Sequence, residues 1–232
     1  SDSNIDKLIQ NYFNTGEGLN PYNPDEISIE LHISGADSAI RYGFYYVEYQ
    51  RDEATNGWKK TDQDFDWRVR FSVDKEGVYF FKLVVLAQGK RVYDSKNIRF
   101  TAKGKSRQVP ITVGKERSLN DRFLRYVDSS GTFIPLGHNL TWTSPGYDNF
   151  DLKKAKLYDE WITDIHKNGG NFFGPMFNPT THGFEVEKIG DYNQRQHKLS
   201  EYDHIMEMAD SLGMYTLMQP HYTVRPKAEA WE

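Results

Sequence analysis

A buried strand that ends in polar residues is the feature that most constrains the fold of this chain. Residues 132–142 read TFIPLGHNLTW, an apolar run that gives way to His138, Asn139 and Trp142. The run continues out of a hairpin predicted over residues 123–136. An apolar strand with functional side chains at its carboxyl end is typical of the parallel sheets of α/β proteins.

The same pattern is repeated twice further along the chain. Segments with the helical spacing of apolar residues cover 151–168 and 200–212, and we expect Ser200 to cap the second one. Each segment ends at glycine and is followed by a short apolar strand, at 171–173 and 215–218. Three strands that alternate with two helices predict a parallel α/β arrangement.

The first half of the chain has the alternation of a different fold class. In residues 27–33 apolar and polar side chains alternate, which predicts a strand with one buried face. Tight-turn signals separate it from several further strands. We therefore predict an all-β antiparallel sandwich of the immunoglobulin-like kind over residues 1–115 and the α/β part over residues 116–232. The further strands are predicted at 41–49, 67–73, 78–86, 92–101 and 108–113.

The composition excludes several classes of partner and chemistry. Lys and Arg number 29 against 33 Asp and Glu, a net charge of -4, so we expect no basic surface that gathers nucleic acid. The chain has no cysteine for disulfides, and no apolar stretch approaches the roughly 20 residues of a membrane span. Aromatic residues make up 15% of the chain, and such rings either fill a core or form flat apolar platforms for a ligand.

Several short segments, taken in their order, carry a resemblance to a known enzyme family. In the first half they are Asn20-Pro21-Tyr22, Gly43-Phe44-Tyr45, Trp67-Arg68-Val69-Arg70-Phe71 and Glu76-Gly77-Val78-Tyr79. In the second half they are residues 123–126, Phe133-Ile134-Pro135-Leu136-Gly137 with Asn139 and Trp142, Trp161 with Asn168-Gly169-Gly170-Asn171-Phe172, and Gly213-Met214-Tyr215. With these segments the chain resembles bacterial glycoside hydrolases in which a DUF5060-type β-sandwich precedes a cellulase-like (β/α)8 barrel.

The resemblance implies hydrolysis of glycosidic bonds in a polysaccharide or oligosaccharide. In cellulase-like barrels the two catalytic carboxyl groups lie on the fourth and seventh strands, and the reaction retains the anomeric configuration. A barrel needs roughly 250 residues and eight strands, whereas the second half of this chain has three predicted strands. We therefore expect the N-terminal part of a longer enzyme, with the first three βα units of a TIM barrel, no catalytic residue in this chain and no activity alone.

The resemblance also implies a location and a set of partners. The enzyme would be exported to the periplasm, the cell surface or the medium, with its leader already removed from a chain that begins at Ser1. Its partner is a carbohydrate substrate, and we expect no cofactor and no metal. The histidines His138, His182 and His221 come from three different loops and lack the close spacing of a zinc motif.

Polar and aromatic residues at the three strand ends are the candidate substrate contacts. Trp142 fits stacking on a sugar ring as well as packing under a loop. Neighbouring strand residues point to opposite faces, so one of His138 and Asn139, rather than both, faces the substrate. His221 is either a sugar contact or a histidine satisfied by backbone groups. The full set is His138, Asn139, Trp142, Asn178, Gln219 and His221.

Three alternatives stay open. Related enzymes carry an Arg and a bulky residue at the end of the second strand, where this chain has Gly174-Pro175-Met176-Phe177, so a non-hydrolytic or unusually specific relative also fits. The alternative function is a non-catalytic protein that binds carbohydrate through the β-sandwich, and the alternative fold for the second half is a self-contained small α/β domain. Several sandwich aromatics recur at strand period, which favours packing over sugar binding: Phe44, Tyr46, Trp67, Phe71, Tyr79 and Phe81.

Overall fold

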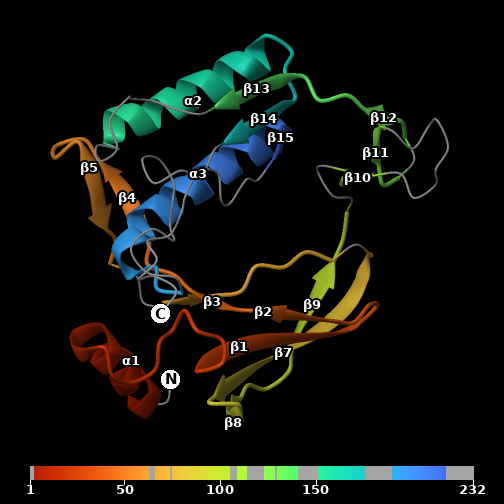
Figure 1. Cartoon of the computed structure of the whole chain (residues 1–232). Helices are drawn as coiled ribbons and strands as arrows, with labels where there is room; N and C mark the ends of the chain where they lie inside the picture. The colour runs from red at the N-terminus through yellow and green to blue at the C-terminus, as the bar shows by residue number, and fades with distance from the viewer. Residues whose placement is uncertain are drawn as a thin grey trace.

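Over the residues that the structure describes, the fold is mostly antiparallel β-sheet with three α-helices, as seen in a computed structural model of the chain (Figure 1). The structure describes residues 3–62, 66–73, 75–104, 109–113, 123–128, 130–140, 151–175 and 190–217. Its helices are α1 (Ser3–Thr15), α2 (Leu152–Lys167) and α3 (Gln196–Leu212), with a 3-10 turn, η2 (Asn193–Arg195), before α3. The strands in these ranges form no closed barrel.

The largest sheet has five strands, and every pairing in it is antiparallel. The order is β2-β1-β7-β8, and β9 also pairs with β7. The strand predicted over residues 27–33 is confirmed, since Ile27, Leu31 and Ile33 are buried on one face. The strands are β1 (Ile27–Gly35), β2 (Ala39–Tyr42), β7 (Gly77–Ala87), β8 (Lys90–Asp94) and β9 (Ile98–Ala102).

The prediction of one strand over residues 92–101 is wrong, because β8 and β9 are separate strands that pair with different parts of β7. Ser95 lies between them and bonds to Leu83 of β7 twice. Its N–H donates to the Leu83 carbonyl, and its hydroxyl accepts from the Leu83 N–H, both at 2.8 Å. The side chain thus takes the place of a strand carbonyl and interrupts the ladder.

The prediction of one strand over residues 41–49 is also wrong. The chain forms β2, then β3 (Phe44–Tyr45) paired with β6 (Trp67–Arg68), and then β4 (Tyr49–Asp52) paired with β5 (Gly57–Lys60). Gly43 lies at the first break, and a Cβ there would lie 3.0 Å from the Cβ of Ile29, so the close approach of the backbone to β1 favours glycine. The strand predicted over 67–73 is likewise reduced to β6.

One face of the five-stranded sheet packs against α1, β3 and β6. Ile27 of β1 is buried together with Tyr45 of β3 and Ile9 of α1. Leu31 and Tyr79 form a second buried cluster towards the other end of β1 and β7. Two β-layers that share apolar side chains are compatible with the predicted sandwich.

A small antiparallel sheet joins the two halves of the chain. It contains β10 (Ile111–Val113), β11 (Leu124–Tyr126) and β12 (Thr132–Phe133), in that order. The pairing of β11 with β12 confirms the hairpin predicted over residues 123–136. β10 was assigned to the first half, so the division at residue 115 falls between two strands that pair with each other.

The second half contains a parallel sheet of three strands, as predicted. Its strands are β13 (Gly137–Leu140), β14 (Phe172–Pro175) and β15 (Tyr215–Thr216), in that order. The prediction of one strand over residues 132–142 is wrong, because β12 belongs to the hairpin. Asn171 separates β12 from β13: its side chain accepts from the Leu136 N–H at 2.8 Å and donates to the Ile134 carbonyl at 3.0 Å.

The two helices of the second half end where the sequence predicts. α2 begins after Asp151, whose Oδ1 accepts from the Lys154 N–H at 3.0 Å, and it is followed by Gly169 with a φ of 83°. α3 ends at Gly213, which caps it in the left-handed conformation. The prediction that Ser200 caps α3 is wrong, since the helix begins at Gln196 and Ser200 lies inside it.

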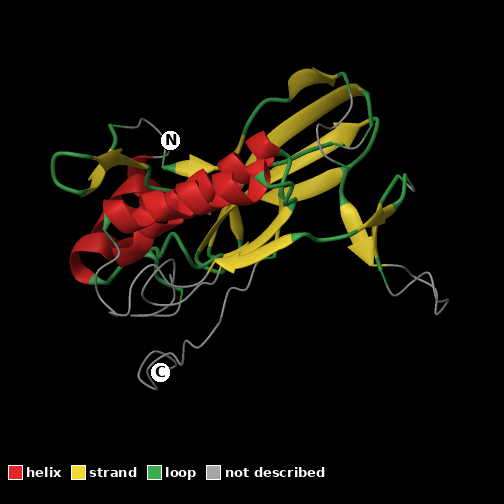
Figure 2. Cartoon of the chain, turned by 90° about the horizontal axis from the view of Figure 1, so that it is seen from above, coloured by secondary structure: helices red, strands yellow, loops and turns green. Residues whose placement is uncertain are grey.

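α2 and α3 pack against each other and against the parallel sheet (Figures 1 and 2). The shared core is fully apolar, with Tyr158 and Ile162 of α2, Ile205 of α3 and Phe173 of β14 each at 0% exposure. Burying such side chains stabilises the fold by about 2 kcal/mol each. None of the helices in the described ranges is both long and apolar enough to cross a membrane.

Candidate functional site

The small antiparallel sheet closes the amino ends of the parallel strands. Phe133 of β12 packs on Tyr215, the first residue of β15, with ring centroids 4.7 Å apart, and Tyr126 of β11 lies 6.4 Å from the same ring. The Tyr215 hydroxyl donates to the Val109 carbonyl at 2.6 Å. Because α2 and α3 cover one face of the parallel sheet, the opposite face and the carboxyl ends are the sides that the described residues leave open.

Asn139 lies on this open face. β13 pairs with β14 so that Asn139 stands opposite Gly174. Leu140, the next residue, is 5% exposed and packs in the core of α2 and α3, so strand alternation places the exposed Asn139 on the other side. A Cβ at Gly174 would lie 2.8 Å from Asn139 Oδ1, so glycine makes room for this amide. The amide offers one acceptor and two donors to a ligand.

His138 is also exposed, and it lies on the same face of β13 as Leu140. Of the two residues, Asn139 therefore faces the open side and His138 does not, and the expectation that one of them contacts the substrate stays a prediction. Trp142, Asn178, Gln219 and His221, together with His182, lie outside the described residues.

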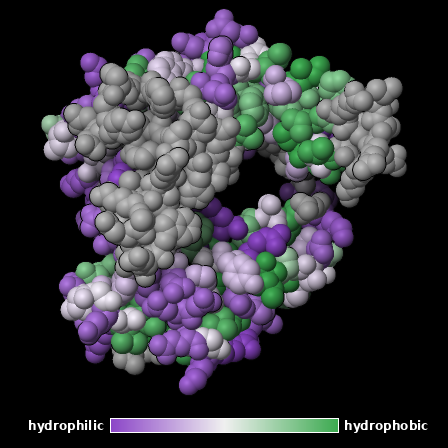
Figure 3. Space-filling model, viewed as in Figure 1, coloured by the Kyte–Doolittle hydropathy of each residue, from purple (hydrophilic) through white to green (hydrophobic). Residues whose placement is uncertain are grey.

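Exposed apolar side chains gather beside the parallel sheet, mostly over its amino ends. Figure 3 shows a largely hydrophobic surface over β10–β12 and the neighbouring edge of β13–β15. Ile134, Leu136 and Leu217 are 62%, 56% and 45% exposed, and Val113 is 65% exposed. An apolar surface of this kind marks a place where other polypeptide or a ligand packs.

A second feature, which the sequence analysis missed, is a buried polar face of α3. Gln196 is 1% exposed; its Oε1 accepts from the Val47 N–H and its Nε2 donates to the Tyr22 hydroxyl, both at 3.1 Å. Ser200 accepts from the Tyr49 N–H at 3.1 Å. These bonds take up the backbone N–H groups of Val47 and of Tyr49, the first residue of β4, and they fix α3 against the antiparallel half of the chain.

Arg51 is the centre of a charged cluster at the same junction. From β4 it reaches Asp159 of α2 and Glu201 of α3, with Nη2 3.0 Å from Asp159 Oδ1 and Nε 3.2 Å from Glu201 Oε2. Further bonds join Arg51 Nη1 to Asp159 and Arg51 Nη2 to Glu201. The Trp58 indole N–H donates to Glu201 Oε2 at 2.9 Å, and His204 Nε2 lies 3.0 Å from Asp159 Oδ1.

The charges of this cluster stabilise one another. Burial alone would raise the pKa of Asp159, but hydrogen bonds from His204 and Arg51 lower it to about 2. The hydrogen bond to Asp159 raises the pKa of His204, against the opposing effect of burial. Asp159 therefore stays ionised at neutral pH, and His204 holds its proton more tightly than a free histidine does.

The cluster has neither the form of a metal site nor that of a catalytic acid pair. Oxygens of Asp159 and Glu201 and a nitrogen of His204 lie within 4.8 Å of one another, a spacing that could suit a cation. The guanidinium of Arg51 already lies between the two carboxylates, and Glu201 is 2% exposed. A substrate or hydrated ion would have to displace this half-buried cation, so the cluster is a structural link between the two halves.

The comparisons with known proteins leave the family open. No protein-family model matches this chain, and no curated protein matches it either. Inferences about its function therefore rest on its residues and their geometry.

Proposed function

We propose that the chain is part of an exported glycoside hydrolase of the kind that its sequence resembles, with β13–β15 as the first strands of its catalytic barrel. The arrangement around these strands carries the proposal: the hairpin closes their amino ends, the helices cover one face, and Asn139 is exposed on the other. In (β/α)8 enzymes the strands surround a closed interior, and substrates bind where the strands end at their carboxyl side.

Asn139 would hydrogen-bond a sugar hydroxyl in this role. Glycoside hydrolysis also needs two carboxyl groups on either side of the bond. The described residues of β13, β14 and β15 contain neither Asp nor Glu. By the resemblance, the two carboxyl groups belong to the fourth and seventh strands of the barrel, and the residues of this chain bind and position the substrate without cleaving it.

The test compares the 232-residue chain with the complete translated gene product on a panel of plant and algal polysaccharides. We expect new reducing ends with the complete gene product and none with the 232-residue chain. Cleavage by the short chain would overturn the assignment of catalysis to other strands, and failure of the complete product on every substrate would overturn the hydrolase.

A matched pair of variants tests the place of the site. Asn139→Ala in the complete product should lower kcat/KM by about three- to tenfold, the effect of one neutral hydrogen bond. Asn14→Ala, an exposed asparagine on α1, is the control and should leave kcat/KM unchanged. Equal kinetics for the two variants would show that the open face of the sheet does not hold the substrate.

A further inference from the structure

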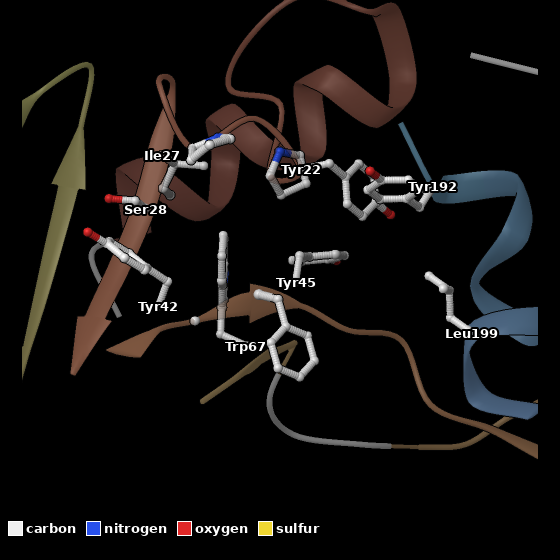
Figure 4. Close-up of a pocket in the computed structure, with 12 residues that line it drawn as sticks. Tyr22, Ile27, Ser28, Tyr42, Tyr45, Trp67, Tyr192 and Leu199 are labelled. Carbon is white, nitrogen blue, oxygen red and sulfur yellow. The ribbon is translucent and has the colours of Figure 1, made fainter. Parts of the chain in front are cut away.

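A cavity of about 750 Å³ lies in the antiparallel half of the molecule, away from the ends of β13–β15. It is bounded by the segment before β1, by β2, β3 and β6, and by the residues around η2 and α3. Aromatic rings dominate its wall, and Figure 4 shows Trp67 standing between Tyr42 and Tyr45, with Tyr22 and Tyr192 beyond them. Its volume is within the range of about 300–1,000 Å³ that small-molecule sites occupy.

The aromatic wall is held in place by edge-to-face contacts. The ring of Tyr45 lies 5.6 Å from Trp67 at 82° and 5.7 Å from Tyr22 at 86°, and Tyr22 lies 5.3 Å from Tyr192 at 78°. In such contacts each ring lies at nearly a right angle to its neighbour, so the ring faces form adjacent walls of the cavity, like the sides of a box. The hydrogen bond from Gln196 to the Tyr22 hydroxyl ties this box to α3.

The cavity carries no formal charge. Among the described residues, the side chains that line it are aromatic, aliphatic, proline or hydroxyl groups, without Asp, Glu, Lys, Arg or His. Burial raises the pKa of Tyr22, and burial together with the nearby Asp66 raises that of Tyr45, so both hydroxyls remain neutral. A phosphate or carboxylate would find no counter-charge here, so the cavity favours a neutral ligand.

Two hydroxyl groups are available at the mouth of the cavity. Within the described part of the chain, neither the Ser28 hydroxyl nor the Tyr42 hydroxyl makes a hydrogen bond, and both residues line the cavity. Tyr42 is 66% exposed, although its backbone belongs to β2 and pairs with Glu30. A large aromatic side chain held at the surface beside a cavity is well placed to contact a ligand.

We propose that this cavity binds one pyranose ring of a neutral carbohydrate. The apolar C–H faces of the sugar pack on the rings of Trp67 and Tyr42, and its hydroxyls bond to Ser28 and Tyr42. The inference goes beyond the proposed hydrolase, because binding here requires no bond cleavage. The sequence favours packing for all of the sandwich aromatics, but the structure gives them two different roles. Tyr79 is fully buried in the core, whereas Trp67 forms part of the cavity wall.

Equilibrium binding to the 232-residue chain tests the proposal. The probes are neutral hexasaccharides of glucose, xylose, mannose or galactose, a hexagalacturonate as the charged counterpart, and indole as an apolar ring without hydroxyls. We expect saturable binding of at least one neutral hexasaccharide by calorimetry, with a change in tryptophan fluorescence that Trp67→Phe abolishes. Preference for hexagalacturonate, binding of indole alone, or no saturable binding of any neutral hexasaccharide would overturn the proposal.

Two exposed tyrosines of the same sheet provide a matched comparison. Tyr42→Ala should weaken binding about five- to tenfold, the effect of one aromatic contact and one hydrogen bond, and it should leave the fold intact because the side chain is exposed. Tyr93 on β8 is 52% exposed and does not line the cavity, so Tyr93→Ala should bind as the unaltered chain does. Equal affinities for the two variants would overturn the site. Reducing-end release by the complete gene product, measured separately, reports on the hydrolase alone.

Discussion

The junction between the two halves of the chain depends on Arg51, and its replacement by methionine is a direct test of that dependence. Arg51→Met keeps an unbranched side chain of similar length but removes the guanidinium that joins Asp159 to Glu201. The Trp58 indole N–H is then the remaining hydrogen bond to Glu201 within the described structure. The substitution therefore leaves a buried carboxylate without its countercharge.

The expected magnitude follows from the burial of the three side chains. Glu201 is 2% exposed, and the side chains of Arg51 and Asp159 are 21% and 26% exposed. Removing one partner of a buried ion pair destabilises a protein by about 3–5 kcal/mol. Because Asp159 keeps some contact with water, we expect the lower end, about 3 kcal/mol, which lowers the Tm of a chain of this size by roughly 6–12 °C.

Thermal unfolding, followed by calorimetry, measures this loss, and Arg70→Met is its control. Arg70 also forms two bonds to a carboxylate of α3, that of Asp203, but its side chain is 52% exposed, so its loss should cost at most about 1 kcal/mol. Adding Glu201→Gln to Arg51→Met should recover part of the stability, since the double variant no longer buries an unpaired charge. A Tm for Arg51→Met equal to that for Arg70→Met would refute the reasoning.

Two further predictions concern pH and the parallel sheet. The raised pKa of His204 contributes stability that is complete below about pH 6.5, the ordinary histidine pKa, and that is lost as pH rises through the folded-state pKa. His204→Gln should therefore remove this decline from a plot of Tm against pH. A plot that is the same for the variant and the unaltered chain would contradict the prediction. Gly137→Ala should destabilise the chain by about 3 kcal/mol or more, measured by unfolding in urea, because the new Cβ would lie 1.6 Å from the Phe172 carbonyl oxygen. Gly57→Ala is the control: its new Cβ meets only ordinary contacts, so this variant should unfold in urea as the unaltered chain does.

Local signals were read correctly from the sequence because their causes are local. The ends of α2 and α3 lie at Gly169 and Gly213, where the backbone adopts a positive φ that glycine tolerates. The strand at 27–33 follows from the alternation of apolar and polar residues within one segment, and its pairing with β7 adds the neighbouring strand. Such elements depend on a few neighbouring residues and need no knowledge of the rest of the chain.

The errors arose where distant residues decide the structure. β2 and β3 lie on either side of Gly43, where the backbone runs close to Ile29, and the Asn171 amide takes up two backbone groups between β12 and β13. Ser200 was read as a helix cap, yet its hydroxyl serves the backbone at Tyr49. No pattern within a single segment could have revealed these contacts.

The candidate sites also divide into residues that a local pattern singles out and residues that distant contacts bring together. The place of Asn139 at a strand end predicts a substrate contact; the pairing of β13 with β14 puts the residue on the open face, and the contact itself stays a prediction. The buried polar face of α3 carries Gln196 and Ser200 four residues apart, but polar residues at that spacing usually form a solvated helix face. The aromatic cavity is lined by Tyr22 and Trp67 from different segments, and alternation within one strand does not predict that they share one space.

Proton NMR of the first product released by the complete gene product tests the central claim most directly. Once the substrate panel has identified a polysaccharide, the anomeric signal of the new reducing end reports both that a glycosidic bond is cleaved and with which stereochemistry. A new signal that keeps the configuration of the cleaved bond is the predicted result. The absence of any new anomeric signal, with every substrate of the panel, would contradict the account.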